Sequence, residues 1–217
     1  MPTVTDLSGP AGPLEALLDP PARTDAPVRA AVVFAHPHPQ FGGTMHTKAV
    51  YQGAKGLTRI GCAVLRFNFR GVGRSAGQFD QGEGEKADFA AALDYMAARH
   101  PGAKLWSAGF SFGAWVALEA GAADDRVSAL IGIAPPVATS ISGHRYTFDG
   151  TLASAKPKFF VQGEADEVCP LEAMWTFYAA LLEPKELVVI DGADHLFEGK
   201  AAEVGEALED LLRDYEE

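Results

Sequence analysis

The chain has 217 residues, 47% of them hydrophobic, and a formal net charge of −11 at pH 7. This length and composition allow a substantial buried core, and we expect a single domain over residues 1–217. The 18 Lys and Arg do not supply the concentrated basic surface that nucleic acids and anionic membranes require, so the charge argues against both partners.

The expected location is the cytoplasm, because the sequence has neither the start of a secretory signal nor a run of roughly 18 apolar residues. The two cysteines, Cys62 and Cys169, lie in separate predicted elements. They cannot build a disulfide framework or a four-cysteine zinc site, and we interpret them as small buried hydrophobic residues.

Apolar runs alternate with helix-like segments along most of the chain. Short extended stretches at 3–7 and 14–18 suggest edge strands. Residues 83–99 predict an amphipathic helix. The strand-like runs after the amino-terminal segment are 30–35, 62–69, 104–110, 127–134, 158–162 and 186–190. Two helical stripes, interpreted as core contacts, consist of Leu171, Met174, Trp175, Tyr178, Leu181 and Leu182 behind Pro170, and of Val204, Leu208, Leu211, Leu212 and Tyr215.

These strands are apolar throughout and separated by helices. Such strands form a parallel sheet covered on both faces, because an antiparallel strand with one wet face would alternate in polarity. The sequence therefore predicts an α/β fold with a mostly parallel sheet and helices on both faces. We find no internal repeat, low-complexity tract or interdomain linker.

Residues 70–77 follow a strand and carry three glycines, at 71, 73 and 77, in the manner of a dinucleotide-binding fingerprint. The spacing fails, because three residues rather than two separate the second and third glycines. The polar stretch 78–82 also delays the helix that would face a phosphate. We interpret the segment as a structural turn.

Residues 104–118 run from a short apolar strand through Gly109, Ser111 and Gly113 directly into a helix. This is the Gly-x-Ser-x-Gly nucleophile elbow, in which glycines leave room for a tight strand-to-helix turn. The turn exposes the serine hydroxyl at the carboxyl edge of the sheet, and Ser111 is the candidate nucleophile.

A serine hydroxyl needs a base to take its proton and a carboxylate to orient that base. His195 follows the strand 186–190, and Asp166 follows the strand 158–162, so both lie on loops at the same edge as the elbow. The chain order Ser, Asp, His is that of an α/β-hydrolase. Other acids near these positions stay open as alternatives to Asp166: Glu164, Glu167, Asp191 and Asp194.

An oxyanion needs two N–H donors. Phe112, directly after the nucleophile, supplies the first. The second is expected from residues 36–43, where Pro37 and Pro39 have no N–H, which leaves His38 as the nearest donor with Gln40 behind it.

Three histidines, His36, His38 and His46, suggest a metal site, but no carboxylate lies within that loop. We therefore expect neither a metal nor a cofactor.

Together, the 109–113 elbow, the 36–43 loop, the 67–75 segment and the Asp166 and His195 loops resemble the α/β-hydrolase superfamily, and most closely its small lidless dienelactone-hydrolase-like esterases. The resemblance spans about residues 28–215. Dienelactone hydrolase itself uses a cysteine nucleophile where Ser111 stands, which argues against dienelactone cleavage. The resemblance implies a carboxylesterase-like serine hydrolase.

About twenty residues between 134 and 157 leave no room for a large cap, so an open site for small or short-acyl esters is expected. Arg145 is a weak candidate for contacting anionic groups; a solvated charge is the preferred interpretation. The partner expected is a small-molecule ester. A thioesterase, a small peptidase and a non-catalytic binding protein on the same fold stay open as alternatives, as does the oligomeric state.

Overall fold

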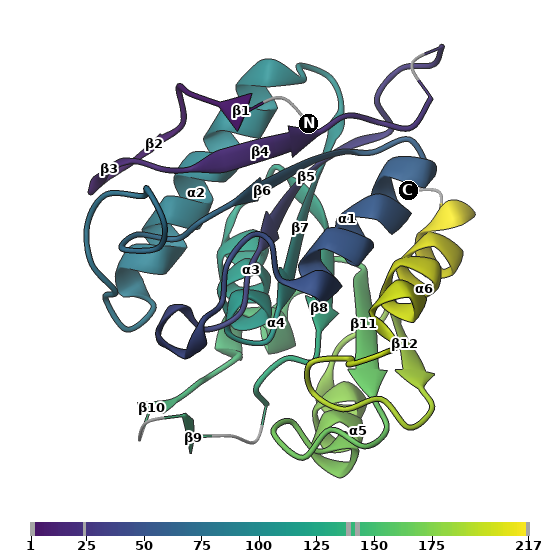
Figure 1. The fold of residues 1–217 in the computed structure, drawn as a ribbon. Helices are drawn as coiled ribbons and strands as arrows, with labels where there is room; N and C mark the ends of the chain where they lie inside the picture. The colour runs from purple at the N-terminus through teal and green to yellow at the C-terminus, as the bar shows by residue number, and fades with distance from the viewer. Residues whose placement is uncertain (1–2, 24, 138–139, 142–143, 216–217) are drawn as a thin grey trace.

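The computed structural model describes residues 3–23, 25–137, 140–141 and 144–215 (Figure 1). Its centre is an eight-stranded sheet whose order is β1-β4-β6-β5-β7-β8-β11-β12. The strands, in that spatial order, are Thr3–Val4, Ala16–Asp19, Ala63–Phe67, Ala30–Ala35, Lys104–Phe110, Val127–Ile133, Lys158–Gly163 and Lys185–Ile190.

The sheet is mostly parallel. From β6 to β12 every neighbouring pair runs parallel, whereas β1 and β4 are antiparallel strands at one edge. The α/β architecture predicted from uninterrupted apolar runs is therefore confirmed. Of the two expected amino-terminal edge strands, the first is the edge strand β1, whereas the second, β4, lies between β1 and β6. The carboxyl ends of the parallel strands meet at one edge, and that edge carries the loops after β5, β7, β11 and β12.

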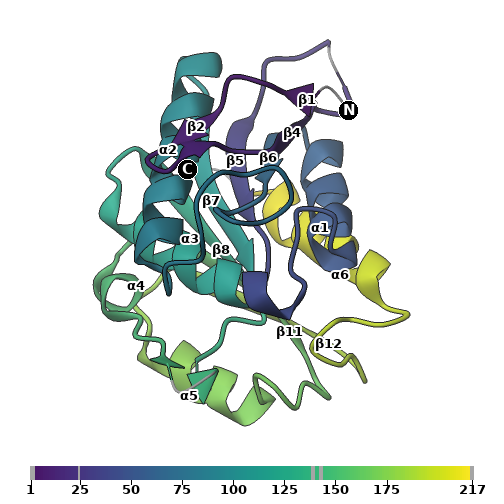
Figure 2. The same ribbon diagram turned by 60° about the vertical axis from the view of Figure 1, so that its left-hand side comes forward.

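Helices cover both faces of the sheet (Figures 1 and 2). On one face, α1 and α6 pack together against a core that contains Val32 and Phe34; on the other, α2 and α3 pack on a core that contains Val33. Successive residues of one central strand thus feed two separate cores, which is why its sequence is apolar at every position. The helices are α1 (Lys48–Arg59), α2 (Glu83–Arg99), α3 (Phe112–Ala123), α4 (Asp149–Ala153), α5 (Leu171–Ala180) and α6 (Ala201–Arg213).

One of the two predicted helical stripes is only partly buried. Met174 and Leu181 are buried as expected, but Trp175 and Leu182 are 48% and 49% exposed. The prediction of core contacts is wrong for these two residues. Trp175 is exposed because α5 lies at the periphery, beside β11, with solvent on its other side. Leu182 lies beyond the end of α5, so the helical stripe does not extend to it. The carboxyl-terminal stripe does enter the core, with Val204, Leu208 and Leu212 fully buried.

The remaining segments are short. A 3₁₀ turn spans Pro39–Phe41, and two small ladders pair β2 (Ser8–Gly9) with β3 (Gly12–Pro13) and β9 (Ser140–Ile141) with β10 (His144–Arg145). Residues 70–77 form the expected turn, closed by a hydrogen bond from the Gly71 N–H to the Ala76 carbonyl. Among the described helices, none combines the length and apolar character needed to cross a membrane.

Candidate active site

Ser111 sits between β7 and α3 in a backbone conformation that side chains rarely adopt, with φ 54° and ψ −122°. Two glycines make this turn possible. A Cβ on Gly109 would lie 2.0 Å from the Gly113 carbonyl oxygen, and one on Gly113 would lie 2.3 Å from the His36 carbonyl oxygen. The turn is also tied to the sheet, since the Ser111 N–H donates to the Ile133 carbonyl at 2.8 Å. The strained backbone is thus imposed by close backbone packing on both sides.

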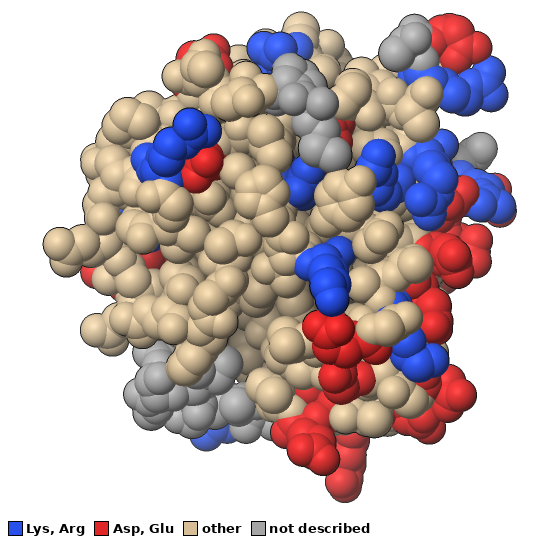
Figure 3. Space-filling view, viewed as in Figure 1, with Lys and Arg blue, Asp and Glu red and all other residues tan. Residues whose placement is uncertain are grey.

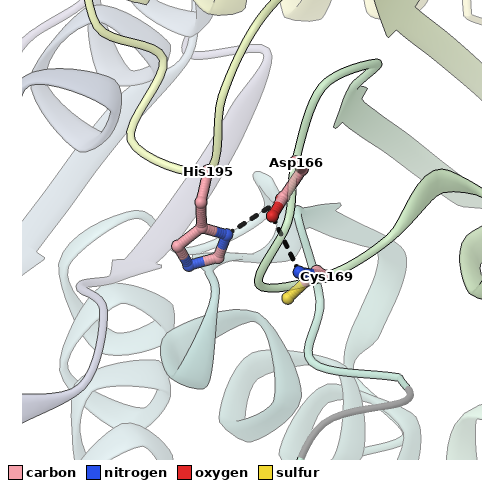
Figure 4. A group of neighbouring side chains, drawn as sticks. All are labelled: Asp166, Cys169 and His195. Carbon is pink, nitrogen blue, oxygen red and sulfur yellow. Dashed lines mark hydrogen bonds and ion pairs between the residues drawn. The ribbon is translucent and has the colours of Figure 1, made fainter.

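Three side chains from three loops form one chain of hydrogen bonds. His195 Nε2 lies 3.0 Å from Ser111 Oγ, and His195 Nδ1 lies 2.9 Å from Asp166 Oδ2. Because an ionised carboxylate only accepts, Nδ1 carries the proton and Nε2 is left to accept the serine O–H. The Asp166 side chain is fully buried and the His195 side chain is 14% exposed. Figure 4 shows the His195 ring facing the Asp166 carboxylate from a separate loop.

Asp166 is distinguished from its acidic neighbours by its hydrogen-bond donors. Its Oδ1 accepts the N–H groups of Val168 and Cys169 at 2.9 and 2.7 Å, and its Oδ2 accepts both His195 Nδ1–H and Gln162 Nε2–H. These four donors account for the four lone-pair sites of a carboxylate. These hydrogen bonds therefore stabilise the negative charge of the Asp166 carboxylate beside His195, although the carboxylate is buried.

The other four acids are exposed. Glu164 accepts the Gly192 N–H, and Asp194 accepts the Glu198 N–H, so both serve to order loops. Among the described residues, the structure thus brings Asp166, and none of the four acidic alternatives, into hydrogen-bond contact with His195.

The loops that carry Asp166 and His195 are joined by their backbones. The Glu164 N–H donates to the Ile190 carbonyl at 3.0 Å, and the Ala165 N–H donates to the Ala193 carbonyl at 2.9 Å. Both loops follow the neighbouring parallel strands β11 and β12, so pairing continues past the ends of the strands. On the other side the His195 ring packs against Phe110, with centroids 5.4 Å apart.

His36 orders the loop that leads to His38. Its Nδ1–H donates to the Pro37 carbonyl at 2.6 Å, and its Nε2 accepts the Phe69 N–H at 3.0 Å. Burial lowers the pKa of His36 to about 4, so the ring is neutral and its two nitrogens have opposite roles. Since the C=O and N–H of a trans peptide point in opposite directions, holding the Pro37 carbonyl also sets the direction of the His38 N–H.

The candidate oxyanion donors are Phe112, which directly follows Ser111, and His38, which lines the same cavity as Ser111. Phe112 is the first residue of α3, where the helix supplies no acceptor for its N–H. Gln40, the alternative donor, is engaged: its N–H donates to His38 Nδ1 at 3.2 Å. The His38 ring packs among Phe41, Phe79 and Phe112, with centroids 4.8 to 5.0 Å apart.

Two buried polar residues, Arg66 of β6 and Asn68 just after it, hydrogen-bond to Met45 in the loop that follows β5. The sequence prediction did not include these two residues. Arg66 donates to both oxygens of Asp19 and to the Met45 carbonyl at 2.7 Å, and Asn68 Oδ1 accepts the Met45 N–H at 2.9 Å. The signal in the sequence is an arginine inside the apolar run 62–69, because a charge in a buried strand needs a partner.

A cavity of about 570 Å³ opens over Ser111 and His195. The residues that line it carry no Asp, Glu, Lys or Arg; they are Pro37, His38, Phe41, Gly42, Gly43, Thr47, Ser111, Val168, His195 and Leu196. Three of them form an apolar rim in contact with solvent, Phe41 (64% exposed), Leu196 (52%) and Val168 (40%). Arg145, the weak candidate for an anion contact, is exposed and does not line this cavity.

Beyond the rim, acidic side chains gather on the side of the molecule that carries β12 and α6 (Figure 3). The exposed acids of the two loops are Glu164, Glu167, Asp191 and Asp194, together with Glu198, which is paired with Lys48 at 3.2 Å. A bound anion would lie near these charges and would find no cation in the lining of the cavity.

Among the described residues, His36, His38 and His46 do not belong to a group of three converging ligand atoms. His36 and His38 are buried and His46 is exposed. One ligand-rich group is present, Asp166, Cys169 and His195, with candidate ligand atoms within 4.8 Å of one another (Figure 4). The Asp166 oxygens in it are already occupied by four donors. Cys62 and Cys169 are buried free cysteines, as the sequence suggested.

The fold and this site define an α/β hydrolase of the serine type. Residues 26–152 match the family described as Serine aminopeptidase, S33, and the chain belongs to that family. An uncharacterised protein from Rickettsia prowazekii is 36% identical over 211 residues, which cover 94% of this chain and 86% of the relative.

Solved structures agree with this assignment. An α/β serine hydrolase homologue from Coxiella burnetii is 37% identical, with a TM-score of 0.88 and 97% of each chain covered. A lidless α/β serine hydrolase from Xanthomonas campestris is also 37% identical, with a TM-score of 0.87 and 98% of this chain and 93% of that chain covered. The esterase domain of a Rhodothermus marinus protein is 26% identical, with a TM-score of 0.75 and 99% and 98% coverage. The chain is thus similar to lidless hydrolases over nearly its whole length.

Proposed function

We propose that this serine hydrolase cleaves small, uncharged carboxylic esters through an acyl-enzyme intermediate. The observation that carries the proposal is the continuous chain Ser111 Oγ, His195 Nε2, His195 Nδ1 and Asp166 Oδ2, with contacts of 3.0 and 2.9 Å. A buried carboxylate holds the imidazole in the tautomer that accepts the serine proton.

The steps follow from these contacts. Ser111 Oγ attacks the ester carbonyl carbon while His195 Nε2 takes its proton, and the N–H groups of Phe112 and His38 receive the developing oxyanion. His195 then gives the proton to the departing alkoxide, and the acyl group stays on Ser111. A water molecule repeats the sequence: it loses a proton to His195, attacks the acyl carbon and releases the carboxylic acid and Ser111.

The lining of the cavity supports an ester of modest size with no charge. Phe41, Val168 and Leu196 present apolar surface, and the nearby loops carry exposed carboxylates that repel anions. An aminopeptidase must also hold a substrate ammonium group, and no carboxylate side chain lines this cavity among the described residues. These features favour ester cleavage over aminopeptidase activity.

The decisive experiment is labelling with a fluorophosphonate followed by peptide mass spectrometry. The wild-type protein is expected to carry one adduct, on Ser111, and Ser111→Ala is expected to carry none. Ser107→Ala is the matched control, because Ser107 is a fully buried serine in β7, the strand that leads to Ser111, and is not among the residues that line the cavity. Folded wild-type protein without an adduct would contradict the proposal.

A substrate panel then separates the open alternatives. We expect neutral p-nitrophenyl esters to be hydrolysed faster than the same esters bearing a carboxylate, acyl thioesters or aminoacyl anilides. Higher kcat/KM on thioesters or anilides would assign the site to a thioesterase or a peptidase. Equal, slow hydrolysis by the wild type and Ser111→Ala would indicate a binding protein.

A further inference from the structure

The amide of Gln162 is fully buried beneath Asp166. Gln162 stands at the end of β11, and the turn that carries Asp166 folds back over it. Its Nε2 donates to Asp166 Oδ2 at 3.0 Å and to the Cys169 carbonyl at 2.7 Å. One side chain thus holds the carboxylate and the end of the turn that presents it.

The orientation of this amide is determined by its neighbours. If the oxygen and nitrogen were exchanged, Oε1 would face the Asp166 carboxylate and the Cys169 carbonyl, two groups that only accept. In the observed orientation both Nε2 hydrogens find acceptors. The cost falls on Oε1, which is buried with no hydrogen-bond partner among the described residues.

An unsatisfied buried acceptor destabilises a protein, and here the two hydrogen bonds donated by Nε2 offset that cost. An apolar side chain of the same shape would avoid the unsatisfied Oε1 but would leave Asp166 Oδ2 and the Cys169 carbonyl without this donor. One of these two acceptors, Asp166 Oδ2, is the oxygen that also receives His195 Nδ1–H.

We propose that Gln162 is a positioning residue for the reaction: it holds Asp166 Oδ2 toward His195 and takes up part of its negative charge. The inference rests on the proposed function of Ser111, His195 and Asp166. Because Gln162 shares Oδ2 with His195, it limits how strongly the carboxylate can stabilise the imidazolium that forms during the reaction.

The test is Gln162→Met, which keeps the approximate volume and removes the donor. We expect kcat to fall about tenfold with KM nearly unchanged, because Asp166 Oδ2 is no longer held toward His195. The acid limb of the kcat/KM profile is expected to move to higher pH, because Asp166 then stabilises the His195 imidazolium more strongly. Ser107→Ala removes a buried hydroxyl that has no hydrogen-bond partner among the described residues, from β7, which β8 separates from β11 in the sheet. This variant should leave both quantities unchanged.

A spectroscopic measurement keeps the inference testable if Gln162→Met does not fold. In wild-type protein, the NMR signals of His195 Nδ1–H and Gln162 Nε2–H should show cross-relaxation, since both protons approach one oxygen. In a folded Gln162→Met, the downfield Nδ1–H resonance should shift. An unchanged kcat and acid limb in that variant, or no cross-relaxation in the wild type, would overturn the role of Gln162. An unlabelled, inactive wild type would instead overturn the proposed function, and the NMR result would still stand by itself.

Discussion

The nucleophile turn and the Asp166–His195 loops are ordered by different means. Ser111 is placed by backbone packing, in which Gly109 and Gly113 let a strand, a helix and the 36–43 loop approach without side chains between them. Asp166 and His195 are placed by hydrogen bonds, among which those from Gln162 and two turn N–H groups fix the carboxylate. The first region tolerates no added atom, whereas the second tolerates no lost donor or acceptor.

Loss of the carboxylate charge tests the second region most severely. Asp166→Asn keeps the shape but lets an amide donor face His195 Nδ1, which favours the wrong imidazole tautomer, and kcat is expected to fall about 10⁴-fold. Steady-state hydrolysis of a neutral p-nitrophenyl ester measures this. Glu167→Gln, an exposed acid on the same turn, serves as the control and should retain activity; a small effect of Asp166→Asn would mean that the carboxylate does not orient His195.

An added methyl group tests the first region. In Gly113→Ala the new Cβ would lie 2.3 Å from the His36 carbonyl oxygen, so backbone must move. We expect the free energy of unfolding to drop by about 3 kcal/mol and activity to be lost with it. Urea unfolding and ester hydrolysis measure these effects. The control is Gly150→Ala, in which the atom nearest to the new Cβ is a Glu119 carboxylate oxygen at 3.1 Å. If Gly113→Ala were as stable and active as Gly150→Ala, backbone packing would not be what places Ser111.

Lowering the pH tests the 36–43 loop, which contains the buried His36. The pKa of His36 is about 4 in the folded protein, below its ordinary value near 6.5, because burial disfavours the charged ring. The unfolded chain therefore binds a proton that the folded protein does not. Stability from this group is full above pH 6.5 and is lost as the pH falls toward 4, by about 2 to 3 kcal/mol at pH 4.5.

Urea unfolding of the wild type and His36→Asn at pH 7.5 and pH 4.5 isolates this contribution. The difference in free energy of unfolding between the two proteins should shrink at pH 4.5. His46→Asn, at an exposed histidine, should follow the wild type at both pH values. A difference that is the same at pH 7.5 and pH 4.5 would show that His36 is not held neutral.

The smallest effect is expected at the rim, where neither backbone packing nor hydrogen bonds act. Leu196→Ala removes apolar surface beside His195 and should raise KM for an ester with an apolar group by about threefold, with kcat nearly unchanged. Leu182→Ala removes a leucine of similar exposure, 49% against 52%, outside the residues that line the cavity. Equal KM values in the two variants would mean that the apolar group of the substrate does not contact Leu196.

Much of the fold could be predicted because apolar runs mark buried parallel strands. The runs 30–35 and 104–110 coincide with β5 and β7. The runs 62–69, 127–134, 158–162 and 186–190 agree with β6, β8, β11 and β12 within two residues at each end. The exposure of Trp175 could not be predicted, because periodicity reports which face of a helix is apolar and cannot tell whether a neighbour covers it.

The sequence by itself determined the parallel sheet and the identities of Ser111, His195 and Asp166 as candidates, because local spacing places each at the end of a strand. Tertiary structure decided which acid faces His195, how the Pro37 to His38 peptide points, and what lies beneath the carboxylate. The physical reason is that strand and turn signals are carried by neighbouring residues, whereas a hydrogen bond between Gln162 or His36 and its acceptor is directional and depends on how loops fold back in space.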